Sequence, residues 1–314
     1  MIGIAAFTAT GPCWICGCCE GVRLHESRLD LAAFAEQDPE LASYTGERVW
    51  LWRCTACGFS QPERLPSLPR YFERMYDQRW SPGWIAGEFE ARYKDLIFSR
   101  VLSGLAERLP VSRRRLLDVG AHVGRFLLLA QRAGWAVEGV ELNPRTAAYA
   151  AQRTGAAVHR VSADRIGAVS SRFDALTLID VLEHIPRPVQ LLREIGSLMT
   201  PGAWIAVKVP CGPAQHVKEK LRARVQPGYR ATLADNLVHV NHFSPRALRL
   251  ALTSAGFDAV SVEVAAPELL ELAGWRGRMS RGFRLTVFHL GRMLPGGVHT
   301  PLALNLQAYA RRQG

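Results

Sequence analysis

The sequence predicts an α/β fold with a doubly wound, mostly parallel sheet and an antiparallel last strand, preceded by a small cysteine-rich module. Three observations predict it. From Arg115 onward, apolar segments of strand length alternate with helical segments, which is typical of parallel sheets. A glycine-containing turn follows the first of these strands. Six of the seven cysteines precede residue 66, in a segment too short to be stabilised by a hydrophobic core without a metal ion or disulfides.

Composition divides the chain into a cysteine-rich module (1–65), a linker with an amphipathic helix (66–112) and a main domain (113–314). A proline-rich joint at 62–69 separates the first two parts. Within the linker, apolar residues recur at helical spacing and predict one amphipathic helix from Glu88 to Leu109.

The elements of the main domain follow in order along the chain. Strands are expected at 116–119, 136–140, 157–161, 173–180 and 203–209, with helices at 126–133, 144–154 and 188–198. Residues 211–243 are rich in basic residues, glycine and proline, and we expect a lid insertion that could cover the site. A helix at 245–255 and strands at 257–264 and 302–312 then complete the sheet.

Length and charge limit the class of protein. The 314 residues are 48% hydrophobic, as in a packed globular protein, and the net charge of +11 suits phosphate or another anionic partner. We find no signal peptide and no apolar run long enough to span a membrane. We therefore expect a cytoplasmic protein, in which paired cysteines more often bind metal than form disulfides.

The turn after the first strand reads Asp118-Val119-Gly120-Ala121-His122-Val123-Gly124. Glu141 ends the next strand, about 20 residues on, where a carboxylate can accept both hydroxyls of a ribose. This arrangement indicates a nucleoside cofactor. A dinucleotide site is disfavoured, because the second glycine of G-x-G-x-x-G is missing and Arg125-Phe126 stands where the third would be.

Four segments, LLDVGAHVGRF, GVELNP, FDALTLIDVLEHIPRPVQLL and LMTPGAWIAVKVP, resemble in order and spacing the motifs of class I S-adenosylmethionine-dependent methyltransferases. The resemblance implies a Rossmann-like fold and S-adenosyl-L-methionine as the cofactor. It further implies that Asp118, Gly120 and Gly124 lie against the methionine part, that Glu141 holds the ribose, that Asp164 contacts adenine and that Asp180 lies beside the methionyl moiety. His122 replaces the usual middle glycine, and it either packs over the loop or contacts cofactor or substrate.

The cysteines form two knuckles, Cys13-x-x-Cys16 and Cys54-x-x-Cys57, of the type that binds one Zn²⁺ through four thiolates. A glycine follows each pair and permits the tight turn that aims backbone amides at the sulfurs. Cys18 and Cys19 offer competing ligands. A four-thiolate site leaves no position for water, so we expect the zinc to be structural.

A cysteine-paired module, a proline-containing joint, a tyrosine-rich helix and this domain together resemble bacterial methyltransferases of sugars and other small metabolites. Sugar C-methyltransferases carry a further large C-terminal domain, which we do not expect in this chain. The implied function is methyl transfer from S-adenosylmethionine to a small anionic or sugar-containing metabolite, such as a nucleotide sugar or glycoside, in surface-glycan or secondary-metabolite biosynthesis.

A weak acceptor requires a general base, and the candidates are His239, His242 and His184, with His239 first. The alternative function is that of a zinc-containing methyltransferase of ribosomal-RNA bases. Against nucleic acid as the partner, Val209-Pro210-Cys211 does not resemble the Asn-Pro-Pro-Tyr type of motif, and the second knuckle lacks the histidine of that group.

Overall fold

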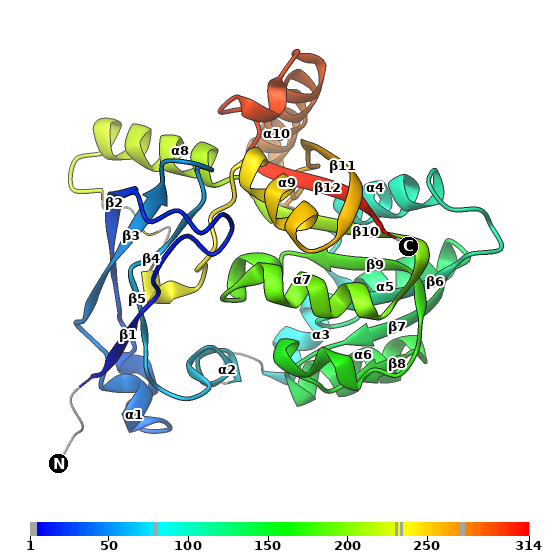
Figure 1. Cartoon of the computed structure of the whole chain (residues 1–314), viewed down its shortest axis with the longest axis horizontal. Coiled ribbons are helices and arrows are strands. Elements are labelled where there is room, and N and C mark those ends of the chain that lie inside the picture. The colour runs from blue at the N-terminus through cyan, green and yellow to red at the C-terminus, as the bar shows by residue number, and fades with distance from the viewer. Residues whose placement is uncertain (1–4, 78–80, 230–231, 233–234, 271–273, 314) are drawn as a thin grey trace.

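The computed structural model describes residues 5–77, 81–229, 232, 235–270 and 274–313, with the side chains of 76, 77, 163 and 164 left out. Its centre is a seven-stranded sheet in the order β11-β12-β10-β9-β6-β7-β8 (Figure 1). Only β12 runs antiparallel to its neighbours. The predicted Rossmann-like, mostly parallel sheet with an antiparallel last strand is therefore confirmed. The strands are β6 (Arg115–Val119), β7 (Ala136–Val140), β8 (Ala157–His159), β9 (Phe173–Ile179), β10 (Met199–Pro210), β11 (Phe257–Val264) and β12 (Asn305–Arg312).

Helices bury both faces of this sheet. On one face, α7 (Pro188–Ser197) and α9 (Pro245–Ser254) pack against Leu117, Leu176 and Ile205. On the other face, α4 (Asp95–Ala106) and α5 (Arg125–Arg132) pack against the alternate strand residues, among them Leu116 and Ala175. Successive strand residues point to opposite faces, so burial on both sides explains why the strands read as continuous apolar runs.

The N-terminal part forms two small antiparallel sheets (Figure 1). The larger sheet joins β2 (Gly21–Arg28), β3 (Arg48–Cys54) and β4 (Ser60–Pro62), and the smaller joins β1 (Phe7–Ala9) to β5 (Arg64–Pro66). The backbone amides of Ser60 and His242 each donate to the other's carbonyl at 3.0 Å, and the rings of Phe59 and Phe243 lie 5.1 Å apart. The module therefore packs directly on the main domain.

Three segments differ from the expectations. The single helix expected at 88–109 is wrong: the chain forms α3 (Pro82–Glu90) and α4, with an extended Ala91 (ψ 130°) between them. The break places Lys94 at the start of α4, from which it reaches Asp180. The segment 211–243 contains α8 (Gly212–Val225), and a helix that the pattern did not predict, α10 (Gly274–Met293), lies between β11 and β12.

The remaining helices are short or flank the core. They are α1 (Pro39–Ala42), α2 (Tyr71–Asp77) and α6 (Pro144–Thr154), with 3-10 turns at 32–34, 163–168, 182–184, 235–237 and 297–299. Within the described part of the chain, every helix is too short or too polar to cross a bilayer.

Candidate active site and metal centre

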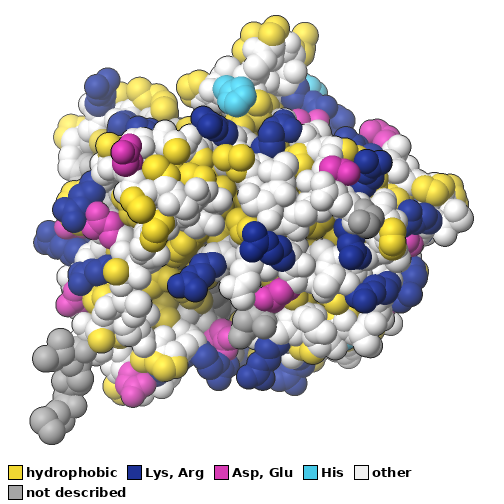
Figure 2. Space-filling model, viewed as in Figure 1, with side chains coloured by type: hydrophobic (Ala, Val, Ile, Leu, Met, Phe, Trp, Pro, Cys, Tyr) yellow, Lys and Arg dark blue, Asp and Glu magenta, His cyan; other side chains and the backbone are white. Residues whose placement is uncertain are grey.

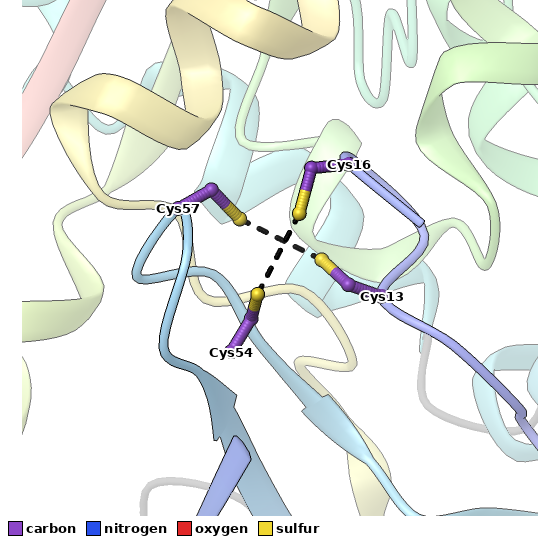
Figure 3. Close-up of side chains that lie close together, drawn as sticks. All are labelled: Cys13, Cys16, Cys54 and Cys57. Atoms are coloured by element: carbon purple, nitrogen blue, oxygen red, sulfur yellow. Dashed lines mark hydrogen bonds between the residues drawn. The ribbon is translucent and has the colours of Figure 1, made fainter. Parts of the chain in front are cut away.

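The four knuckle cysteines converge on one point in the N-terminal module (Figure 3). The Sγ atoms of Cys13 and Cys57 lie 3.6 Å apart, as do those of Cys16 and Cys54, and all four lie within 4.8 Å of one another. A tetrahedron with Zn–S bonds of about 2.3 Å has S–S edges of about 3.8 Å. The donor set and its spacing therefore fit a Zn²⁺ ion.

Local backbone geometry explains how the knuckles form. Gly17 and Gly58 adopt left-handed conformations, with φ of 71° and 73°, and each donates its amide to the carbonyl of the first cysteine of its knuckle. Cys18 and Cys19 instead contact the backbone carbonyls of Glu20 and Gly17. The structure thus brings the four expected thiols together and keeps the two competing cysteines outside.

The pKa values of two of the thiols are shifted in opposite directions. A hydrogen bond from the Cys57 thiol lowers the pKa of Cys13 to about 5 and raises the pKa of Cys57. A thiolate at physiological pH in a half-buried site is the species that binds Zn²⁺.

The glycine loop lies at the carboxyl end of β6. Gly120 and Gly124 have φ of 83° and 84°, and a Cβ on Gly124 would lie 3.0 Å from the Ala150 backbone. The amides of Gly120 and Ala121 donate to the Val140 carbonyl, at 2.8 and 2.9 Å, which ties the loop to the end of β7. A side chain at Gly120 would meet Val181 and one at Gly124 would meet Ala150, so the path of the loop requires glycine at both positions.

Glu141 follows β7 beside that loop. One carboxylate oxygen accepts from the His122 amide at 2.8 Å and the other from the Asn143 amide at 2.9 Å. Burial raises the pKa of Glu141, although these amides oppose the shift. A fixed carboxylate next to the glycine loop fits the ribose hydroxyls of S-adenosylmethionine.

His122 has a φ of 52° and its ring packs edge-on against Trp84 of α3, with centroids 5.5 Å apart. Burial, with a smaller contribution from Lys94, lowers its pKa to about 4, so the ring is neutral at physiological pH.

Asp118 lies beneath the loop. It is 3% exposed and accepts a hydrogen bond of 2.6 Å from the Thr177 hydroxyl. Burial raises its pKa to about 7, against the effect of that bond. Asp164 belongs to the 3-10 turn at 163–168, and its side chain lies outside the described part of the structure.

Two lysines that the sequence reasoning missed hold Asp180, which follows β9. Lys94 Nζ lies 3.0 Å from its carboxylate, and the buried Lys208 of β10 forms a second, closer ion pair. Burial alone would raise the pKa of Asp180, but the two ammonium groups outweigh it and the pKa is lowered. The one signal in the sequence for this ion pair was Lys208, a charged residue inside the otherwise apolar strand sequence AWIAVKVP.

Glu183, His184 and His239 form a third cluster, at the same sheet edge. One ligand atom of each lies within 4.8 Å of the others, so the cluster could hold a cation. His184 Nδ1 donates to the Val238 carbonyl at 2.6 Å, and its ring lies 4.8 Å from that of His239. Burial lowers the pKa of both histidines and raises that of Glu183 to about 8.

His242, the third candidate base, lies in a row of histidines that leads to the module. Its ring is 6.5 Å from that of His239 and 5.5 Å from that of His216 in α8, which lies 5.0 Å from His25 of β2. Burial lowers the pKa of His216 and of His242 to about 3. Among the described residues, the buried Nε2 atoms of His25, His216 and His242 have no hydrogen-bond partner.

The strand order, the glycine loop and the carboxylate after β7 define the class I methyltransferase fold. Residues 90–262, more than half of the chain, match the family described as a methyltransferase domain, and the chain belongs to this family.

Curated relatives match part of this region. The ubiquinone biosynthesis O-methyltransferase of Albidiferax ferrireducens is 29% identical over 103 residues, 31% of this chain and 41% of that protein. The corresponding protein of Ralstonia nicotianae is 27% identical over 140 residues, 43% of this chain and 57% of that protein. The chain thus spans about half the length of these relatives.

Among solved structures, the complex of the Haloferax volcanii Trm112 methyltransferase activator with a methyltransferase contains a similar chain. It aligns with a TM-score of 0.52 at 15% identity, over 74% of this chain and 97% of that chain. This likeness concerns the fold alone.

Proposed function

We propose that the protein transfers the methyl group of S-adenosylmethionine to a hydroxyl of a small anionic or sugar-containing metabolite, such as a nucleotide sugar or glycoside. The observation that carries the proposal is the cluster of Glu183, His184 and His239 at the sheet edge that also bears the glycine loop and Glu141. The curated relatives, named as O-methyltransferases of ubiquinone biosynthesis, support a small acceptor with a hydroxyl group.

The chain's own residues bind and orient the cofactor, which supplies the electrophilic methyl group when bound. Gly120 and Gly124 let the backbone approach the methionine part, and Glu141 accepts the ribose hydroxyls. Asp180, fixed by Lys94 and Lys208, would lie beside the methionyl moiety of the bound cofactor. Positioning of the two reactants can supply a large part of the rate acceleration.

His184 is the better oriented of the candidate bases. Its Nδ1 donates to the Val238 carbonyl, which leaves the lone pair on Nε2. His239 packs against the same ring, and burial lowers the pKa of both histidines, which favours the neutral form that accepts a proton from a hydroxyl. We assign proton removal to His184 and orientation of the acceptor to His239.

In the structural module, Cys13, Cys16, Cys54 and Cys57 would hold Zn²⁺ with no position left for substrate. The ion would join β3 and the loop that precedes β2, and so support the surface on which His242 and Phe243 pack.

The test measures transfer of a radiolabelled methyl group to nucleotide sugars, soluble glycosides and ribosomal RNA. We expect turnover on a small acceptor, and a loss of about 100-fold in kcat for His184→Asn with an unchanged Kd for S-adenosylmethionine. His159→Asn, at a half-buried ion pair on β8, is the matched control. Transfer to RNA only, or full activity of His184→Asn, would overturn the proposal.

A further inference from the structure

Helix α10 presents an apolar stripe to solvent. Trp275, Met279 and Phe283 are 59%, 63% and 69% exposed, and Leu290, Met293 and Leu294 are exposed as well. At 3.6 residues per turn, these six positions fall within an arc of about 100°. The buried residues of the helix, among them Phe288, lie on the opposite side. The stripe therefore points away from the body, where α10 projects beyond the sheet (Figure 1).

The same helix is strongly basic. It contains five arginines, Arg276, Arg278, Arg281, Arg284 and Arg292, and neither Asp nor Glu occurs between residues 274 and 293. Arg292 pairs with Glu263 of β11 at 3.5 Å. Within the described part of the chain, no carboxylate lies within ion-pair distance of Arg276, Arg278 or Arg281. Arg276 and Arg278 lie about 50° and 110° around the helix from the centre of the apolar stripe, whereas Arg281 lies on its opposite side.

Helix α8 repeats this pattern nearby. Val217, Leu221 and Val225 are exposed at successive helical turns, with Lys218, Lys220, Arg222 and Arg224 among them. A shallow groove of about 450 Å³ separates this stripe from Pro301 and Leu304, in the segment that follows α10. This groove joins α8 to the segment that follows α10, and Figure 2 shows apolar side chains on the projection at the top of the molecule, with Lys and Arg side chains at its base.

Sheet topology places this surface near the site. β10 and β11 are both antiparallel to β12, so their carboxyl ends meet at the same edge. α8 starts two residues after β10, and the segment containing α10 connects β11 to β12 at that edge. The glycine loop and Asp180 lie at the carboxyl ends of β6 and β9, parallel neighbours in the same sheet.

We propose that α10, together with α8, docks the protein on the surface of an anionic phospholipid membrane. The stripe would enter the boundary between headgroups and acyl chains, and Arg276 and Arg278, which flank it, would pair with lipid phosphates. At about 1.5 Å per residue, the 20-residue helix lies about 30 Å along the surface. A second copy of the chain does not fit this face, because two such helices would oppose ten arginines without a carboxylate.

Co-flotation of the full chain with vesicles tests the proposal. We expect binding to vesicles of phosphatidylcholine with 30% phosphatidylglycerol, little binding to phosphatidylcholine alone, and release at 0.5 M salt. Arg276→Glu with Arg278→Glu, and Met279→Ser with Phe283→Ser, should each weaken binding about 100-fold or more. Arg160→Glu and Val111→Ser, exposed residues away from α10 and α8, are the matched controls.

Thermal unfolding of each variant shows whether it is folded, since the substituted side chains are exposed. Equal binding by the wild type and the α10 variants, or no binding by either, would overturn the proposal. Light scattering gives a further test: a dimer that the α10 substitutions dissolve would show that a second copy, and not lipid, covers the face.

Discussion

The ion-paired cluster at the carboxyl edge of the sheet gives a quantitative prediction. Lys208 is 3% exposed, and Asp180 is held by Lys208 and by Lys94. At 3.0 Å and an effective dielectric constant of about 20, the Coulomb attraction of Asp180 and Lys94 is about 5 kcal/mol. The closer pair with Lys208 is no weaker. Desolvation costs several kcal/mol per ion, so the net contribution is much smaller than this sum.

Replacing one partner leaves the other buried and uncompensated. We expect Asp180→Asn to lower the free energy of unfolding by about 3–5 kcal/mol, because two ammonium groups lose their shared carboxylate. Lys208→Met should cost about 2–4 kcal/mol, since Lys94 still faces Asp180. The double variant should cost less than the sum of the two, by about 2 kcal/mol.

Urea unfolding at pH 7.5 measures these differences, and the exposed Lys218→Met serves as the control. Because the folded pKa of Asp180 is depressed, its contribution is complete above the unfolded value of about 4 and is lost as the pH falls through the folded value. The cost of Lys208→Met should therefore shrink below pH 4. Additive effects, or a cost below about 1 kcal/mol for either single variant, would refute the ion-pair interpretation.

Three further outcomes are expected. Cys57→Ser should abolish bound zinc, measured by elemental analysis, and lower the melting temperature, whereas Cys19→Ser should retain one zinc per chain. Asp118→Asn should stabilise the protein by up to about 4 kcal/mol above pH 7 and should have no such effect below pH 4. The folded pKa of Asp118, about 7, exceeds the unfolded value of about 4, so the stability of the wild type falls as the pH rises from the unfolded to the folded pKa. Gly124→Ala should lower the free energy of unfolding by about 2–4 kcal/mol and Gly134→Ala by about 1 kcal/mol: both have positive φ, but only Gly124 faces backbone within 4 Å. Equal zinc contents of Cys57→Ser and Cys19→Ser would contradict the first expectation. A gain in stability of Asp118→Asn that does not depend on pH would contradict the second, and equal losses of stability in Gly124→Ala and Gly134→Ala would contradict the third.

Much of the fold was predictable because strands buried on both faces and their glycine turn leave clear local signals. Leu116, Leu117 and Val119 predict β6, and the apolar segments that follow place its neighbours. The cysteine spacing likewise predicted the four thiols that lie together, because a local turn at Gly17 or Gly58 fixes each knuckle.

The rest depends on contacts between distant segments. The break between α3 and α4 brings Lys94 to Asp180, 86 residues away in the sequence, and no local period can show such a contact. The row of histidines joins His25 to His242 through α8, and only the packing of the module on the main domain creates it. Helix α10 was missed because arginines separate its apolar residues along the sequence and because its apolar stripe faces solvent and not the core.

Binding of S-adenosylmethionine to the folded, zinc-loaded chain tests the central claim most directly. Isothermal titration should show one site per chain, and Glu141→Ala should weaken binding at least tenfold, because the carboxylate that receives the ribose hydroxyls is gone. Glu107→Gln, an exposed side chain in the loop after α4, should leave the affinity unchanged. The absence of binding, or equal affinity of the wild type and Glu141→Ala, would contradict the account.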